Sequence, residues 1–302
     1  MNLAKRYRFR GLLLLAERQF LQVIELDPDF VDAYAELADL YMDLGQFDKA
    51  LALYRKASQL DPGNPLNLLR QLGLYQQLGD VAAMEGIRNT IAASTGAGFW
   101  LVDYADLWLG LERNSVDATR ESLNRLLPKI DKLQYFKELA GTAEVLLRNK
   151  DRARELFVDA NPGWLDPEQW DRLIQSKLLL PCMFSWILIN TGDEKLGNDL
   201  LRQTMIFHEE TLPAAIEHAD MFVPDICYLT SGDNEKALNS IETQLEHNHL
   251  YRRDLIYRYP MYDQIRDEPR FRAVVEERER RIAIQREKVA QMNAKQSPVP
   301  SG

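Results

Sequence analysis

Apolar and polar positions show their clearest pattern over residues 31–64, where they predict two short helices joined by a tight turn. Tyr34 and Tyr41 lie on the apolar face of the first predicted helix. Gly45 occupies the turn, because a helix C-terminus often requires a positive φ, which glycine adopts without strain. The second helix is expected to end before Pro62, because proline cannot continue a helix.

Two small residues, Ala38 and Ala50, are expected to meet between these helices. Small side chains let antiparallel helices approach closely, and larger neighbours fill the remaining space. A hairpin of this length cannot bury both of its apolar faces alone. It therefore requires copies of itself on either side.

The spacing of turn and small residue recurs along the chain. From Ala50, steps of 34 residues lead back to Ala16 and forward to Met84 and Ala118, and a step of 35 leads to Ala153. Later steps are longer, because proline-containing loops separate the units. We therefore predict about seven helix pairs, over residues 1–30, 31–64, 65–98, 99–130, 131–160, 168–208 and 212–246.

These units resemble tetratricopeptide repeats (TPRs) in four features: a pair of small residues, an aromatic residue at the end of the first helix, a glycine turn, and an Asp-Pro pair that ends the second helix. The resemblance implies an all-α fold, a right-handed α-α superhelix whose first helices line a concave groove for a peptide or helix. Met84 and Gly197 replace the small alanine, so we expect the middle repeats to be tilted or widened.

The C-terminal part of the chain departs from the repeat. Residues 247–294 are expected to close the solenoid with a capping helix over about 269–292, whose apolar stripe is interrupted by Arg278 and Gln285. Residues 295–302 are expected to be disordered. The aromatic-rich segment and acidic turn before the helix resemble the tail of TPR regions in bacterial nucleotide cyclases, winged-helix transcription regulators and some serine/threonine kinases.

Net charge and the lengths of apolar runs exclude several classes of function. The net charge of −9 argues against a general nucleic-acid or anionic-membrane surface, and no apolar run approaches the ~20 residues of a membrane span. Cys182 and Cys227 are expected to be buried free thiols. The alternative is a disulfide between facing repeats, which would indicate an oxidising compartment.

Candidate chemistry is sparse in the sequence. His208 and His218 lack the i, i+4 spacing of a zinc-binding pair, and no nucleophile, base or phosphate-loop motif accompanies them. We therefore expect neither an enzyme nor a bound cofactor or metal.

The remaining candidate is the groove surface formed by the first helices. Its predicted partner-binding residues share positions in the repeat register and are Ala35, Asp39, Met42, Asp43, Leu69, Gly73, Gln76, Gln77, Trp100, Asp103, Trp186 and Phe222. The early groove is expected to be acidic, unlike the Lys/Arg clamp of chaperone-binding TPRs. The later groove is expected to be apolar and filled by the protein's own C-terminal helix, with a partner helix as the alternative.

The sequence thus predicts a non-catalytic protein–protein interaction scaffold, and the resemblance implies the TPR region of a bacterial signalling or regulatory protein. One alternative is a structural module that forms a homodimer. Another is a small-ligand receptor with an apolar pocket near Trp186 and Phe222.

Met1 falls three residues after the expected start of the first repeat, so we expect a piece of a longer protein. We expect a cytoplasmic location, or a periplasmic one if an upstream span tethers the chain.

Overall fold

The computed structural model describes residues 1–9, 12–177, 180–211, 225–250 and 256–296. Over these residues the chain is α-helical, with short 3-10 and π-helical turns and no strand. The all-α repeat fold predicted from the sequence is therefore confirmed.

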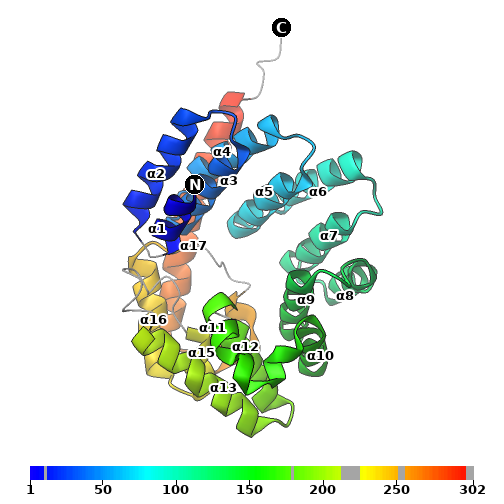
Figure 1. Ribbon diagram of the computed structural model, residues 1–302, viewed down its shortest axis with the longest axis vertical. Helices are drawn as coiled ribbons and strands as arrows, with labels where there is room; N and C mark the ends of the chain where they lie inside the picture. Colours follow the sequence, from blue (N-terminus) through cyan, green and yellow to red (C-terminus); the bar gives the residue numbers. More distant parts are fainter. Residues whose placement is uncertain (10–11, 178–179, 212–224, 251–255, 297–302) are drawn as a thin grey trace.

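Antiparallel helix pairs follow one another along the chain (Figure 1). The first helices of the pairs are α1 (Asn2–Phe9), α3 (Val31–Asp43), α5 (Pro65–Leu78), α7 (Trp100–Glu112), α9 (Gln134–Leu146), α12 (Leu180–Asn190) and α15 (Asp225–Ser231). Their second helices are α2 (Leu13–Leu26), α4 (Phe47–Leu60), α6 (Val81–Thr95), α8 (Val116–Leu126), α10 (Lys150–Ala160), α13 (Glu194–Ile206) and α16 (Asn234–Glu246). The division into seven repeats stays a prediction.

Short elements occupy the connections and the C-terminal part. They are η1 (Leu127–Lys129), η2 (Pro162–Leu165), η3 (Pro167–Gln169), α11 (Trp170–Lys177), η4 (Phe207–Thr211), η6 (Ile256–Arg258) and η7 (Pro260–Gln264). A long helix, α17 (Pro269–Gln296), follows them. It extends beyond the predicted 269–292 and into the first two residues expected to be disordered, and 297–302 lie outside the described residues.

The tight turns keep one backbone geometry even where glycine is lost. Gly45 has a φ of 66°, as the sequence predicts, and Gly79 has a φ of 63°. In the pairs without a turn glycine, Asn114 (φ 54°) and Arg148 (φ 63°) adopt the same left-handed conformation. This conformation costs a side-chain-bearing residue about 1–2 kcal/mol, so the surrounding helix packing must stabilise it.

Small residues set how closely paired helices approach. Ala38 and Ala50 are both fully buried, as expected for the centre of a hairpin. At Gly197, a Cβ atom would lie 2.8 Å from the backbone oxygen of Ser185 and 2.9 Å from the backbone nitrogen of Ile189. The pair α12/α13 is thus closer than alanine permits, so Gly197 does not widen this pair. The expected tilt of the middle repeats stays a prediction.

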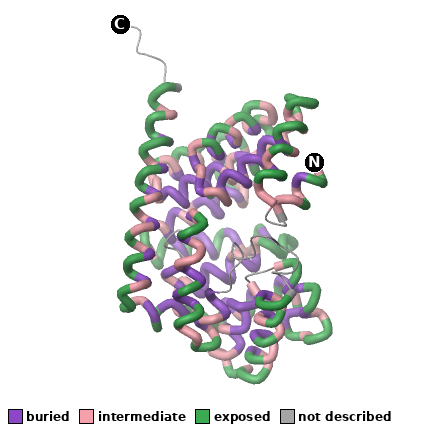
Figure 2. The backbone as a smooth tube through the Cα atoms, turned by 90° about the vertical axis from the view of Figure 1, so that its left-hand side faces the viewer, coloured by how far each residue is buried: buried purple, intermediate pink, exposed green. Residues whose placement is uncertain are grey.

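The C-terminal helix joins distant parts of the array. Helix α17 packs against α16 at one end and against α4 and α5 further along, and Figure 1 shows it running along one side of the molecule. Its outward side remains exposed over much of its length (Figure 2). The polar residues that interrupt its stripe are buried: Arg278 lies 5.2 Å over the ring of Tyr257, and Gln285 accepts a hydrogen bond from the backbone N–H of Phe47.

Side chains of the C-terminal segment satisfy backbone carbonyls at the ends of helices throughout the array. The last carbonyls of an α-helix have no partner within it and need donors from elsewhere. In five hydrogen bonds a side chain donates to a backbone carbonyl: Asn248 to that of Leu44, Arg286 to Leu78, Arg258 to Leu111, Gln264 to Leu229 and Arg281 to Leu245. The segment therefore closes the array by donating hydrogen bonds to the C-terminal ends of five helices.

The predicted filling of the late groove by the C-terminal helix itself is not what the structure shows. Helix α15 is covered by η7, the short element before α17. The Tyr262 hydroxyl donates to Asp225 at 2.6 Å, and both side chains are buried. Aromatic residues before the helix cover this surface, whereas α17 packs mainly against α16, α4 and α5.

Candidate partner-binding surface

The structure places the predicted groove residues in different environments. Those buried in the protein are Ala35, Met42, Gln76, Gln77 and Asp103. Those half-buried are Asp39, Asp43, Leu69, Trp100 and Trp186. Gly73 is exposed, with no atom within 4 Å of the position of a Cβ, whereas Phe222 lies outside the described residues.

The acidic side chains expected on α3 are neutralised by a basic side chain of the protein itself. Arg8 of α1 places its Nε 2.7 Å from Asp43 and its Nη1 3.8 Å from Asp39, and the Tyr54 hydroxyl donates to Asp39 at 2.5 Å. Burial raises the pKa of Asp39, against the opposing charge of Arg8. Burial by itself lowers the pKa of Arg8, but the carboxylates of Asp43, Asp39 and Glu36 together outweigh burial and raise that pKa. These carboxylates stabilise the α1/α3 contact and offer little net charge to a partner.

The two glutamines of α5 are also engaged internally. The Gln76 amide donates to Glu112 of α7 at 3.0 Å, and the Gln77 amide donates to the Gln76 oxygen at 2.6 Å. Buried polar groups are costly unless they are hydrogen-bonded. This chain of bonds therefore links neighbouring first helices.

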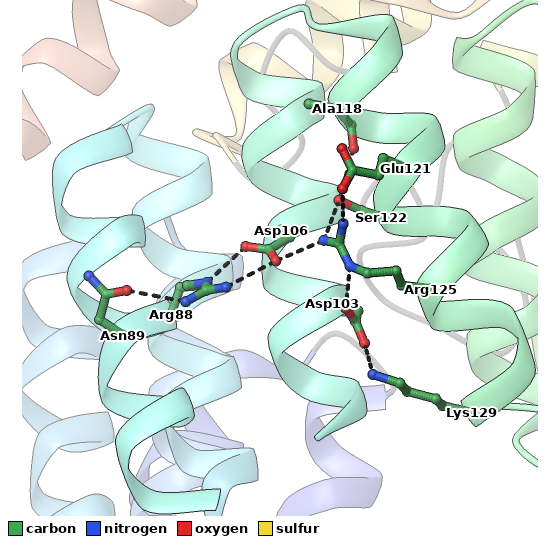
Figure 3. A network of polar contacts seen from close by, with 9 residues as sticks. All are labelled: Arg88, Asn89, Asp103, Asp106, Ala118, Glu121, Ser122, Arg125 and Lys129. Atoms are coloured by element: carbon green, nitrogen blue, oxygen red, sulfur yellow. Dashed lines mark hydrogen bonds and ion pairs between the residues drawn. The ribbon is translucent and has the colours of Figure 1, made fainter. Parts of the chain in front are cut away.

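A polar network ties α6, α7 and α8 together (Figure 3). Asp103, predicted as a groove residue, is buried and accepts from Arg125 at 2.8 Å and from Lys129. Arg88 and Arg125 both donate to Asp106, at 2.8 and 3.0 Å. Paired carboxylates and cations with their donors committed to one another are typical of a structural network.

An apolar row remains available on the first helices. Leu66, Trp100 and Tyr135 occupy equivalent positions in the repeat register, each 18 residues before the register residues Met84, Ala118 and Ala153, and are 34 and 35 residues apart. Leu66 is 45% exposed and Tyr135 is 60% exposed, and Trp100 is half-buried. We call these three residues the apolar ladder.

Aromatic contacts hold part of the ladder in place. The rings of Trp100 and Phe136 are 4.4 Å apart in an edge-to-face arrangement, and the rings of Tyr135 and Phe136 are 5.4 Å apart. Such pairs favour a fixed relative orientation. The sequence predicted Trp100 as a binding residue but not Leu66 or Tyr135, although the repeat register relates all three.

Comparison with known proteins identifies the repeat. A tetratricopeptide repeat model matches residues 31–64. The chain therefore contains a TPR repeat at these residues. It is 27% identical over 166 residues to the human protein "General transcription factor 3C polypeptide 3", an alignment that covers 52% of this chain and 18% of that protein. The chain thus spans less than a fifth of that relative's length.

A solved TPR structure aligns with this chain along most of its length. The crystal structure of the P58(IPK) TPR domain is matched over 94% of this chain and 97% of that one, at 15% identity. The TM-score is 0.29, which is too low for the likeness to bear on the arrangement of the repeats.

The two cysteines of the chain form a disulfide. Cys182 of α12 and Cys227 of α15 are bonded, with their Cα atoms 4.8 Å apart and both side chains fully buried. The expectation of free thiols is wrong, because the two first helices pack side by side and bring distant positions within bonding range. Trp186, on the same helix as Cys182, is half-buried against the core.

The described part of the chain offers neither a metal site nor a membrane span. Among these residues, no group of three or more His, Cys, Asp or Glu side chains is placed to hold a metal ion. Within the same ranges, no helix combines the length and hydropathy needed for a membrane span. His208, one of the two histidines without zinc-pair spacing, is buried.

Proposed function

We propose that this TPR protein is a non-catalytic interaction scaffold that binds an apolar peptide segment of a protein partner through the apolar ladder. TPR repeats generally mediate protein–protein interaction, and the chain carries this repeat. The observation that supports the site is the exposure of Leu66 and Tyr135 at equivalent positions on either side of Trp100. Exposed apolar side chains in a row are typical of surfaces that bind partners.

The surroundings of the ladder favour an apolar partner. Gly73, on the same helix as Leu66, leaves open space where a side chain would stand. The acidic groups expected in this region are paired within the protein, because Asp103 contacts Arg125 and Lys129. The ladder therefore offers shape and apolar area rather than charge. By resemblance of its C-terminal tail, we further propose that the scaffold belongs to a bacterial signalling or regulatory protein.

A peptide-display selection tests the proposal. A random peptide library is selected against the full chain, and enriched peptides are synthesised for affinity measurement by fluorescence polarisation. We expect the double variant Leu66→Ser/Tyr135→Ser to bind them at least about tenfold more weakly, since burying two large apolar side chains contributes over 1.4 kcal/mol. The matched control is Val116→Ser, which removes an exposed apolar side chain (51% exposed) from the second helix α8.

Thermal unfolding of both variants checks that neither loses its fold. Equal affinity of the enriched peptides for the parent chain and the double variant contradicts the site. Failure to enrich any peptide contradicts the binding of an apolar segment.

A second candidate function, homodimerisation, is favoured by a different surface. Leu14 and Leu21 lie seven residues apart on α2, 73% and 47% exposed, and Leu3 of α1 is 48% exposed. Residues seven apart share one side of a helix. Sedimentation velocity of Leu14→Ser/Leu21→Ser against the parent chain tests it, and a parent chain that stays monomeric at high concentration contradicts it.

A further inference from the structure

A cavity of about 310 Å³ lies where the C-terminal segment enters α17, away from the apolar ladder. Tyr257, Phe271 and Val275 supply its apolar wall. The rings of Tyr257 and Phe271 are 5.2 Å apart, edge to face, and both side chains are buried. This volume is at the lower end of the range for small-molecule sites.

The charged lining of this cavity is mainly basic. Arg258, Arg266 and Arg272 line it together with one acid, Glu276. The lining therefore carries a net charge of about +2, whereas the whole chain carries −9. Behind this wall, Arg278, only 2% exposed, places its guanidinium 5.2 Å from the ring of Tyr257.

Internal hydrogen bonds hold these guanidinium groups without using all of their donors. Arg258 donates to Leu111 at 2.9 Å and to Asn114 at 2.7 Å, which fixes it against the α7–α8 turn. Arg266 donates to Asp263 at 2.7 Å. A guanidinium carries five N–H donors. The bonds formed within the described residues therefore occupy two donors of Arg258 and one of Arg266.

Arg272 completes the rim in the same way. It donates one hydrogen bond to Asp267 at 2.6 Å, and its side chain is 59% exposed. Planar guanidinium groups bind carboxylate and phosphate oxygens through paired N–H donors. An anion held by these three groups would place its apolar portion against Tyr257 and Phe271.

We propose that this cavity, the arginine pocket, binds a small organic anion in which a carboxylate or phosphate is attached to a flat apolar group. The anionic group contacts Arg258, Arg266 and Arg272, and the flat group packs on the aromatic wall. Because Arg258 also holds the α7–α8 turn, an occupied pocket lies between the C-terminal segment and the fourth helix pair. The arginine pocket is separate from the apolar ladder, so the test of one proposal does not depend on the result for the other.

Isothermal titration of the full chain with phenyl phosphate and phenylacetate tests the proposal. Benzyl alcohol and phenylacetamide serve as neutral probes of similar shape. We expect both anions to bind with a 1:1 stoichiometry and the neutral probes to bind at least about tenfold more weakly, because charge-assisted hydrogen bonds are lost. Neutral probes that bind as tightly as the anions would overturn the proposal, as would the absence of binding by either anion at about 10 mM.

Variants locate the binding. Arg266→Gln/Arg272→Gln is expected to weaken phenyl phosphate binding about tenfold or more, and Glu276→Gln to strengthen it, since an opposing charge is removed. Arg202→Gln is the matched control, because Arg202 pairs with Asp199 three residues earlier, as Arg266 does with Asp263. Unchanged affinity in the double variant, or weaker binding in Glu276→Gln, would overturn the assignment.

Discussion

Phe47 and Gln285, 238 positions apart in the chain, are joined by a hydrogen bond from the Phe47 backbone N–H to the Gln285 side-chain oxygen at 3.2 Å. Phe47 is the first residue of α4, where backbone N–H groups lack partners within the helix. The helix has no side-chain cap of its own, so Gln285 of α17 supplies an acceptor from outside it. The C-terminal helix is thereby coupled to the best-matched repeat of the array.

Replacing Gln285 should therefore loosen the closure of the array. Gln285→Met keeps the size of the side chain but leaves the buried N–H of Phe47 without this acceptor. We expect the free energy of unfolding to fall by about 1–3 kcal/mol. Urea denaturation followed by circular dichroism measures the change.

Lys288→Met, on the exposed side of the same helix, is the control and should change stability by less than about 0.5 kcal/mol. Equal effects of the two substitutions would show that Gln285 contributes nothing specific. Hydrogen exchange at the start of α4 should also be faster in Gln285→Met alone.

Reduction of the disulfide should lower stability. The bond between Cys182 and Cys227 closes a loop across 45 positions. Restricting the unfolded chain in this way contributes about 2–4 kcal/mol in the loop-entropy description. Thermal unfolding with and without reductant should show a lower midpoint for the reduced protein.

The double variant Cys182→Ala/Cys227→Ala provides the reference state for this experiment. Its midpoint should not respond to reductant, and it should unfold near the temperature of the reduced parent chain. A reductant effect of equal size in this variant would rule out the disulfide as its source.

Substitution of two helical glycines should have opposite effects. Gly197→Ala places a Cβ within 2.9 Å of backbone atoms of α12, so we expect destabilisation by about 1–3 kcal/mol. Gly86→Ala, inside α6 with no atom within 4 Å of the new Cβ, should stabilise by about 0.5–1 kcal/mol. The denaturation midpoints of the two variants measure these changes in stability. Destabilisation of the same size in both variants would contradict the explanation that α12 and α13 approach too closely for a Cβ at position 197.

Glu144 on α9 should make stability depend on pH. Its side chain is buried, one carboxylate oxygen lacks a hydrogen-bond partner within the described residues, and burial raises its pKa in the folded protein. The folded state therefore binds a proton more tightly than the unfolded state does. Stability from this group is full below the unfolded pKa and is lost as the pH rises through the folded pKa.

Glu144→Gln removes that loss, so the variant should melt at a higher temperature than the parent at pH 7, with the difference shrinking as the pH falls towards 4. Melting curves across this range measure the trend. The control is Glu287→Gln, an exposed residue of α17. A difference in melting temperature that grows on acidification would contradict a raised pKa at Glu144.

The sequence by itself determined the local structure of the repeats. Turn conformation at Gly45, the burial of Ala38 and Ala50 and the all-α fold depend on residues within about 34 positions of one another, so periodicity and turn chemistry suffice to predict them. The repeat register also relates Leu66 to Trp100, although exposure was needed to select them. Short-range steric and hydrogen-bonding preferences act before any tertiary contact forms, which is why they appear in the sequence.

Only the tertiary structure decided how the copies meet and what remains exposed. The path of the array sets which distant positions come together, so the sequence could not choose between free thiols and the bond from Cys182 to Cys227. It likewise could not show that Arg8 neutralises Asp43 or that Gln285, an interruption in an apolar stripe, reaches a helix end. These contacts depend on small rotations between successive repeats that accumulate along the chain, and no local pattern encodes their sum.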